Sequence, residues 1–375
     1  MQTAIISVIN DLNTDVRVHK NCMVLKELGY NVILFGREKK ISVAMEERPY
    51  KTIRKKMFFE KKIWFYAEYN IRLFFFLLFK KPSILVSNDL DTLFPNFIIS
   101  KIKKVPLIYD SHEYFTEMPE VINRKIVKKT WEKLEKFIFP NLKNEIITVN
   151  ESIANLYEKK YNKKLFVVRN IPELNKTIRI KSREELNLPI DKKIIILQGA
   201  GININRGAEE AIEAMKYVEN AILLIIGGGE VFEDLFLLPK KFNIENKVVF
   251  IKKLPYKELI QYTFNSNLGL TLDKDTNINY KYSLPNKLFD YINAQIPILS
   301  SNLIELRNII SKYNIGTFIE SHSPIEIAEK INKIIFDEKI YNEYKENLKI
   351  AVNELTWEKE KHVLINIYKN YLNNE

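Results

Sequence analysis

Short hydrophobic runs recur along the whole chain, and polar segments with a helical period separate them. Such runs are bounded by turn residues and are too short for helices, so they predict buried parallel strands joined by crossover helices. In the first half of the chain the predicted strands are AIISVI (4–9), NVILF (31–35), ILVS (84–87), PLIYD (106–110), EIITV (145–149) and KLFVVRN (164–170). We expect the first helix near residues 16–28.

A second series follows the charged passage ELNKTIRIKSREELNLPIDKK (173–193), which we interpret as a linker with a short helix. Its predicted strands are IIILQG (194–199), AILLIIGGG (221–229), KVVFI (247–251), LGLTL (268–272) and IPILSS (296–301). With 375 residues the chain is also longer than one typical domain. The predicted fold class is therefore α/β, with two Rossmann-like doubly wound domains.

Composition narrows the class of protein. Cys22 is the single cysteine, which excludes a disulfide framework within the chain and a cysteine-based metal cluster. The start, MQTAIISVIND, lacks the regions of a signal peptide, so we expect a cytoplasmic location. The net charge of +11 suggests an acidic partner, although a composition rich in Lys, Ile and Asn is also typical of AT-rich genomes.

Basic and aromatic residues concentrate in residues 51–81, KTIRKKMFFEKKIWFYAEYNIRLFFFLLFKK. Its longest apolar run, LFFFLLF, is far shorter than the ~20 residues that a membrane span needs. One interpretation is an interfacial surface that contacts anionic headgroups while its aromatic rings enter the membrane boundary. The other is a helix buried under a sheet, with its basic residues in water.

Eight of the ten glycines lie from Gly199 onward, and a phosphate-binding loop needs glycine for close backbone approach. We therefore expect a nucleotide to bind the second domain. In LQGAGININRGAEEAIEAM (197–215), the amides after Gly199 and the guanidinium of Arg206 could bind a diphosphate, or Arg206 could be a surface charge. We interpret the glycine run IIGGGE (225–230) as a requirement of turn geometry and packing.

A helix start in YKYSLPNKLFDYINAQIP (280–297) predicts a second anion-binding element. Pro285 suits the first helical position, and the free amides beside it, with Lys287, favour a bound anion. Asp290, one turn further, could accept hydrogen bonds from sugar hydroxyls. The candidate donor-binding residues are Gly199, Arg206, Ser283, Leu284, Pro285, Asn286, Lys287 and Asp290.

Polar residues also follow strands in the first half. In LIYDSHEYF (107–115), His112 lies between carboxylates and could be catalytic or a helix cap. Asp89 and Asp91 have a spacing that can hold a divalent cation, but a helix start favours Asp91 as an N-cap. We expect Asp273 and Asp275 to lie in a solvated loop that could line a sugar pocket. We expect the other histidines, His19, His322 and His362, at the surface.

Several motifs together resemble the retaining, GT-B-fold glycosyltransferases of family 4. They are DVRVHKNCMVLKELGYNVILF (15–35), SNDLDTLFPNF (87–97), IYDSHEYFTEMPE (108–120), TVNESIANLYEKKY (148–161), VVRNIP (167–172), the 197–215 stretch, SLPNKLFDYINAQIPILSS (283–301) and TWEKEKHVLINIYKNYL (356–372). The resemblance implies a GT-B architecture, in which two Rossmann-like domains face a cleft. We expect an acceptor domain at 1–175, a nucleotide-sugar domain at 186–356, and a helix at 357–375 that returns to the first domain.

Residue roles follow from the same resemblance. Arg206 and Lys287 would neutralise the diphosphate, and His112 would approach the donor sugar, so these three are the expected catalytic residues. Asp290 stands where the family has the second glutamate of a pair, and the first would fall at Tyr282, which has no carboxylate. Asn279, Asp275 or the amides of 283–287 could substitute for it. Weaker candidates for the acceptor side or the cleft are Asp15, Arg17, Asp89, Asp110 and Glu113.

The expected reaction is retaining transfer of a hexosyl or N-acetylhexosaminyl group from a nucleotide sugar, with UDP as the family's usual base carrier. The acceptor would be a saccharide or lipid-linked saccharide in surface-glycan biosynthesis. We expect no metal, no cofactor and no nucleic acid, and peripheral contact with the inner face of an anionic membrane through residues 51–81. Two alternatives stay open: a GT-B-fold sugar-nucleotide epimerase or hydrolase, and a non-enzymatic basic protein that binds membrane or nucleic acid.

Overall fold

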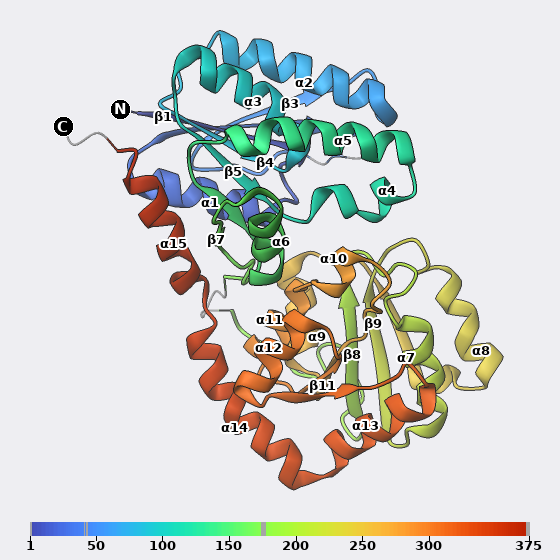
Figure 1. Ribbon diagram of the computed structural model, residues 1–375. Helices are drawn as coiled ribbons and strands as arrows, with labels where there is room; N and C mark the ends of the chain where they lie inside the picture. The colour runs from blue at the N-terminus through green and yellow to red at the C-terminus, as the bar shows by residue number, and fades with distance from the viewer. Residues whose placement is uncertain (1, 41, 43, 174–177, 373–375) are drawn as a thin grey trace. The chain divides into compact units, whose positions relative to one another are not determined.

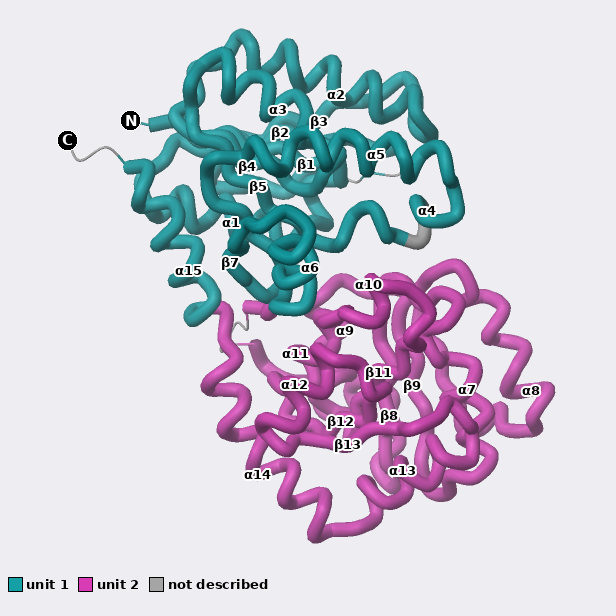
Figure 2. Tube along the Cα trace, viewed as in Figure 1, with its two compact units in different colours: residues 1–170, 358–375 teal, residues 171–357 magenta. Residues whose placement is uncertain are grey.

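The computed structural model describes residues 2–40, 42, 44–173 and 178–372 (Figure 1). It divides into two compact units, coloured separately in Figure 2. Unit 1 comprises Met1–Asn170 and Glu358–Glu375, and unit 2 comprises Ile171–Trp357. The residues that follow the last strand of unit 1, from Ile171 onward, thus group with the second unit.

Both units are parallel sheets covered by helices. The strands are β1 (Thr3–Asp11), β2 (Asn31–Glu38), β3 (Lys51–Lys56), β4 (Ile84–Asn88), β5 (Leu107–Ser111), β6 (Ile146–Thr148), β7 (Phe166–Val167), β8 (Lys193–Gly199), β9 (Ala221–Gly227), β10 (Val248–Lys252), β11 (Leu268–Thr271), β12 (Ile298–Ser301) and β13 (Gly316–Ile319). In unit 1 their order is β3-β2-β1-β4-β5-β6-β7, and in unit 2 it is β10-β9-β8-β11-β12-β13. Every pairing in the described residues is parallel, which confirms the predicted fold class.

Most strands are followed by one or more α-helices. The α-helices are α1 (Val16–Glu27), α2 (Lys62–Leu78), α3 (Leu90–Lys103), α4 (Pro119–Ile122), α5 (Lys125–Ile138), α6 (Glu151–Tyr161), α7 (Ala208–Ala214), α8 (Leu238–Phe242), α9 (Tyr256–Phe264), α10 (Ile278–Lys281), α11 (Asn286–Asn293), α12 (Ile304–Tyr313), α13 (Pro324–Phe336), α14 (Glu338–Glu354) and α15 (Trp357–Lys369). Of these, α13, α14 and α15 follow the last strand. No helix within the described ranges is long and apolar enough to cross a membrane.

Two strands were absent from the sequence prediction. The basic stretch Lys51–Lys56 forms β3 at the edge of the first sheet, where lysines protect the unpaired strand edge. The second, β13, is only four residues long, GTFI, and half of it is buried. Neither has the long apolar run by which the other strands were found.

Two further expectations were wrong in detail. The predicted strand 164–170 is reduced to the two residues of β7. The short helix expected in 173–193 is a series of turns in its described part, 178–192. Residues 174–177 of that passage lie outside the described residues.

The last helix belongs to unit 1 although unit 2 precedes it in the chain. Glu360 of α15 accepts hydrogen bonds from the backbone N–H and the Nε of Arg169, both at 2.8 Å. Further along, the Tyr30 hydroxyl donates to the carbonyl of Tyr368, and the Tyr368 hydroxyl donates to Asn21. These bonds fasten α15 to α1 and to the end of the first unit's chain.

Candidate functional site

The polar candidates of unit 1 gather where β4 and β5 end. In a parallel sheet the carboxyl ends of all strands lie on one edge, where ligands usually bind. The register pairs Asn88 with Asp110, so the residues that follow each strand, Asp89 and His112, become neighbours. This juxtaposition follows from the sheet order, in which β4 and β5 are adjacent.

His112 is enclosed by oxygen atoms from both strand ends. Its Nδ1 lies 3.4 Å from the Asp89 carboxylate, and its Nε2 lies 3.2 Å from Asn88 Oδ1 and 3.7 Å from the Asp110 carboxylate. Burial by itself would lower the pKa of His112, but the charge of Asp89 and the contact with Asp110 outweigh it and raise the pKa to about 9. The ring is therefore a cation at neutral pH, and 16% of the side chain stays exposed.

Asp110 is held by Arg17 rather than by water. The Arg17 Nε and Nη2 atoms donate to the two carboxylate oxygens at 3.2 and 2.6 Å, and Asn21 adds a third bond at 3.3 Å. The remaining Arg17 nitrogen donates to the carbonyl of Val168. Although burial acts in the opposite direction, the charge of Arg17 keeps the pKa of Asp110 well below its usual range. Asp110 thus stays ionised beside His112 and helps to raise the pKa of the ring.

The expected N-cap role of Asp91 was wrong. Asp89, not Asp91, occupies the N-cap of α3, and its φ of +57° is unusual for a residue other than glycine. Its carboxylate accepts the backbone N–H of His112 at 2.9 Å, while its own N–H donates to the carbonyl of Asp110. Asp91 is buried in the first turn, and burial together with the charge of Asp89 raises its pKa well above the ordinary range.

The two remaining candidates of unit 1 are Asp15 and Glu113. Asp15 is the N-cap of α1, where its side chain accepts the N–H of Val18, so a capping role accounts for it. Glu113 is exposed, and its backbone carbonyl accepts the Ser111 hydroxyl at 2.8 Å. This hydrogen bond within the loop is thus made by the backbone of Glu113.

In unit 2, Arg206 is anchored inside the structure. Its guanidinium lies 3.1 Å from the carboxylate of Asp273 and 4.2 Å above the ring of Tyr280. Asp273 has no exposed surface, so its expected place in a solvated loop was wrong. It lies two residues after β11, and the next residue, Lys274, donates its backbone N–H to the carbonyl of Asn205 in the loop that carries Arg206. Burial acts against the charge of Arg206, but Asp273 raises the pKa of the guanidinium further.

Lys287 is the second cation beside Asp273. Burial lowers its pKa, the Asp273 carboxylate counteracts this, and the charge of Arg206 lowers the pKa further. Within the described residues Lys287 makes no ion pair, and the buried Nε of Arg206 has no hydrogen-bond acceptor. The two predicted phosphate ligands are therefore brought together around a single carboxylate, with donors left over.

The start of α11 lies one residue later than predicted. Pro285 is its N-cap and Asn286 its first residue, a shift within the usual uncertainty of helix ends. Ser283 donates its backbone N–H to the carbonyl of Tyr280, and Leu284 packs against the apolar core of the unit. Asn286 is exposed at the tip. The dipole and the first-turn amides of this helix favour the binding of an anion at this end.

Asp290 is fully engaged by its own unit. Its two carboxylate oxygens accept hydrogen bonds from Gln198 Nε2 at 2.8 Å and from the Tyr256 hydroxyl at 2.9 Å. Gln198 is held in turn by Thr263. A sugar hydroxyl would have to share these oxygens, so the predicted ribose contact of Asp290 stays a prediction.

The glycine-rich turns behave as the packing interpretation predicted. A Cβ atom on Gly227 would lie 1.8 Å from the carbonyl oxygen of Gly199, and one on Gly229 would lie 2.4 Å from the backbone of Ile202. Both residues have positive φ. Gly199 has no such conflict, because only the side chain of Ile202 comes within ordinary contact distance. The run therefore lets two loops at the carboxyl edge of the sheet touch.

Tyr282, the position without a carboxylate, is the C-cap of the short helix α10. One suggested substitute, Asp275, pairs with Lys281 at 3.4 Å and is half exposed. The structure also places His19 against Tyr50 and His322 between Ser301 and the carbonyl of Leu272, so these two are partly buried, contrary to expectation. His362 is exposed, as predicted.

Sequence reasoning missed the residues that hold the predicted ones in place. Asn88, Tyr280, Gln198 and Tyr256 each contact a candidate side chain. Asn88 ends β4 and Gln198 is the last residue but one of β8, so a polar residue at a strand end was a usable signal for these two. Across the described part of the chain, no three His, Cys, Asp or Glu side chains converge as metal ligands would.

Comparison with known proteins gives one family match, to part of the chain, and a set of solved structures with the same fold. Residues 178–351 match the family described as Glycosyl transferases group 1. No curated protein matches the chain. Among solved structures, the sucrose-phosphate synthase of Thermosynechococcus elongatus is similar at 15% identity and a TM-score of 0.81, with 99% of each chain covered.

Two further structures show the same fold. A glycosyltransferase from Rickettsia africae has 13% identity and a TM-score of 0.77, covering 100% of this chain and 99% of its own. Anabaena HepE in complex with UDP-glucose has 12% identity and a TM-score of 0.74, covering 99% and 100%. At such identities the likeness concerns the fold. The chain therefore has the GT-B fold, and its residues 178–351 match the family of glycosyl transferases group 1.

Proposed function

We propose that the protein transfers a hexosyl or N-acetylhexosaminyl group from a UDP-sugar to a saccharide or lipid-linked saccharide acceptor, with retention. The observation that carries this proposal is the pair of cations, Arg206 and Lys287, beside the single buried carboxylate of Asp273. Two positive charges share one negative charge there, so a bound anion completes the balance. A diphosphate also suits the planar donors of Arg206 and the free amides that begin α11.

The donor base is proposed from likeness alone. HepE, which shares the fold, binds UDP-glucose, and this favours UDP as the nucleotide. We assign none of the described residues to a contact with the base of the nucleotide. A role in surface-glycan synthesis at the cytoplasmic face of a membrane follows as the proposed setting, because the basic and aromatic segment 51–81 lies in unit 1.

The proposed reaction depends on charge stabilisation more than on proton transfer. As the bond between the anomeric carbon and the diphosphate oxygen breaks, Arg206, Lys287 and the α11 amides stabilise the negative charge of the leaving group. The acceptor hydroxyl then forms its bond on the same face, and its proton passes to a phosphate oxygen. His112, a cation at neutral pH, contacts the transferred sugar in this scheme, and the sugar shares the ring N–H groups with Asp89 and Asn88. In this scheme no metal and no cofactor is needed.

Binding of the donor is tested by titration calorimetry with UDP-sugars, UDP and GDP. Because a charge-assisted contact to phosphate contributes about 1.5–3 kcal/mol, Arg206→Met and Lys287→Met should each weaken binding by about tenfold or more. Lys252→Met is the matched control, since Lys252 is exposed and pairs with Glu233 on the surface. Unchanged affinity in both site variants would place the nucleotide elsewhere.

Catalysis is tested on the same preparations. His112→Ala should lower turnover far more than it lowers nucleotide affinity, because the proposed contact is to the sugar. The anomeric configuration of the product, read by NMR, checks retention. Epimerisation or hydrolysis of the donor without any acceptor would instead favour the epimerase, the reading that the missing carboxylate at Tyr282 keeps open.

A further inference from the structure

Helix α2 has two apolar faces, although it covers only one sheet. Phe65, Tyr69, Leu73 and Leu77 are buried against unit 1. Ile63, Ile71, Phe75 and Phe79 are exposed. Each exposed residue lies two positions from a buried one, which is about 200° around a helix with 3.6 residues per turn. A surface helix ordinarily has polar residues opposite its core face. The outer face of α2 is apolar instead, so we expect another apolar surface to cover it.

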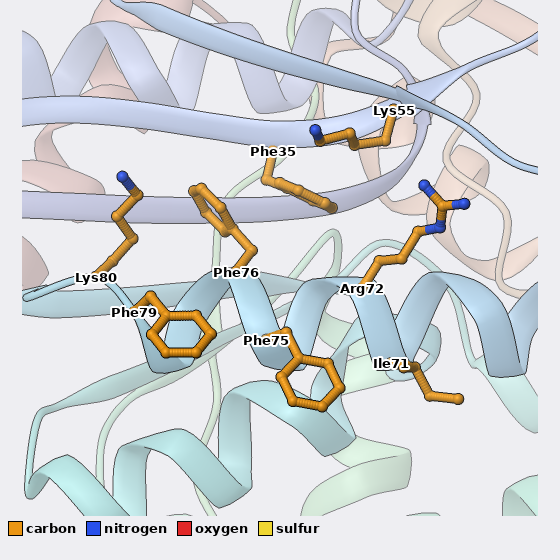
Figure 3. A pocket seen from close by; sticks show the side chains of 8 residues that line it. All are labelled: Phe35, Lys55, Ile71, Arg72, Phe75, Phe76, Phe79 and Lys80. Carbon is orange, nitrogen blue, oxygen red and sulfur yellow. The ribbon is translucent and has the colours of Figure 1, made fainter.

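A groove of about 430 Å³ lies along the C-terminal half of this helix, and β2 and β3 each contribute one residue, Phe35 and Lys55, to its lining (Figure 3). Its floor is the stacked pair Phe35 and Phe76, whose ring centroids are 4.8 Å apart. Figure 3 shows Ile71 and Phe75 on the side of the helix away from the strands. The volume falls within the ~300–1,000 Å³ range of small-ligand sites, and the lining is almost entirely apolar apart from its cations.

The aromatic residues before α2 are held rigidly in their exposed positions. Glu68 accepts the backbone N–H groups of Phe58 at 3.0 Å and Phe59 at 2.9 Å, and it pairs with Arg72 at 2.8 Å. Arg72 in turn lies 5.0 Å above the ring of Phe58, which is 86% exposed. Trp64, 65% exposed, packs near Phe59. Because these contacts order the loop beforehand, binding through its rings costs little conformational entropy.

The charges around the groove indicate what occupies it. Lys55 and Lys80 line it, and within the described residues neither forms an ion pair. Arg72 and Lys56 do have carboxylate partners, Glu68 and Glu38. Protein interfaces are depleted in lysine, whereas an anionic bilayer attracts lysine around an apolar face. An apolar stripe with unpaired lysines beside it therefore matches a lipid surface better than a protein.

We propose that the outer face of α2 binds an anionic bilayer, and that the groove holds one hydrocarbon chain of an anionic phospholipid. The helix lies in the plane of the interface, with Phe75 and Phe79 among the acyl chains. Lys55 and Lys80 meet the phosphate of the headgroup. This inference rests on the proposed function, which it deepens: it would bring the enzyme to the membrane that carries a lipid-linked acceptor.

Binding is measured by co-sedimentation with vesicles of phosphatidylglycerol and phosphatidylcholine in equal parts, and with vesicles of phosphatidylcholine alone. The wild type should bind the anionic vesicles and release them in high salt, because part of the attraction is electrostatic. Removing both exposed rings in Phe75→Ser/Phe79→Ser should weaken binding by about tenfold or more. The control, Ile325→Ser/Ile350→Ser, removes two similarly exposed side chains from unit 2 and should bind as wild type.

Occupancy of the groove is measured separately. Trp64 fluorescence should be quenched by phospholipids brominated on the acyl chain, and Lys55→Gln/Lys80→Gln should remove the preference for anionic vesicles. Equal binding by the wild type and the Phe75/Phe79 variant would overturn the proposal. So would a dimer, seen by sedimentation velocity without vesicles, that the same variant dissociates, because a second copy would then cover the face.

The two proposals fail in different ways. Nucleotide-sugar titration of the Phe75/Phe79 variant should match the wild type, since both residues lie outside the donor site. If the wild type binds the donor but does not bind the vesicles, only the membrane site is refuted. Intact vesicle binding with no donor binding would refute the proposed function and leave the membrane surface standing.

Discussion

At the scale of single residues, His112 owes its properties to neighbours from two strands. Its ring lies between Asp89 and Asp110, and Arg17 keeps Asp110 ionised. The aspartate at 110 was visible in the sequence beside the histidine, but Arg17 is 93 positions away from it. The sequence around His112 could therefore identify it as a candidate, but it could not show whether the ring is charged.

The charge of His112 should make the stability of unit 1 depend on pH. Its pKa rises from 6.5 to about 9 on folding, so this contribution is fully present below pH 6.5 and is lost as the pH rises through about 9. The difference in unfolding free energy between the wild type and His112→Gln should therefore shrink as the pH rises from 6 to 10. Urea denaturation across this range measures it.

A second variant tests the cause of that shift. Asp89→Asn keeps the side-chain shape and a residue that tolerates positive φ, but it removes the charge that raises the histidine pKa. NMR titration of His112 in this variant should give a clearly lower pKa than about 9. An unchanged value would mean that Asp89 is not the source.

At the scale of elements, the glycines of unit 2 separate two requirements that look alike in sequence. Gly227, Gly228 and Gly229 are consecutive, yet a Cβ would collide at the first and third and would meet nothing within 4 Å at the second. The tight positions are where the ends of β8 and β9 and their following loops touch. The run is thus required by backbone approach at specific positions and not by glycine content as such.

This contrast gives a matched pair of substitutions. Gly227→Ala should destabilise unit 2 by about 3 kcal/mol or more, because the added carbon lies 1.8 Å from the Gly199 carbonyl and φ is +153°. Gly228→Ala should change the unfolding free energy by no more than about 0.5 kcal/mol. Urea denaturation of the two variants side by side decides the matter, and equal effects would show that the loops relax freely.

At the scale of the whole molecule, the chain leaves unit 1 after Asn170 and re-enters it at Glu358. The return depends on Glu360, a carboxylate that is 5% exposed and paired with Arg169. Stability of unit 1 therefore depends on the far end of the sequence. Unit 2 has its own two apolar cores and needs no residue of α15 to complete them.

Substitution of that carboxylate should affect one unit only. Glu360→Ala removes charge-assisted hydrogen bonds to Arg169 and should cost about 3 kcal/mol of unit 1 stability. Hydrogen exchange should accelerate in α15 and in the residues before Asn170, and stay unchanged across Ile171–Trp357. Glu358→Ala, at an exposed position in the same turn, is the control with little effect. Faster exchange throughout both units would contradict this separation.

The sequence by itself determined the parts of this protein that depend on local pattern. Apolar runs of strand length identified both sheets almost completely, and glycine, proline and arginine signals predicted the loops of unit 2 that we propose to bind phosphate. These features are encoded within about ten residues, so they survive without tertiary information. The same locality explains why the polar strand β3 and the short strand β13 were missed.

Only the tertiary structure decided which side chains act on one another. Packing buried Asp273 under Arg206, engaged Asp290 with Gln198 and Tyr256, and placed Arg17 against Asp110. It also turned one basic, aromatic segment into an edge strand and a helix with an uncovered apolar face. Charge, burial and exposure depend on distant neighbours, and the order of strands in a sheet, not the order of residues in the chain, brings those neighbours together.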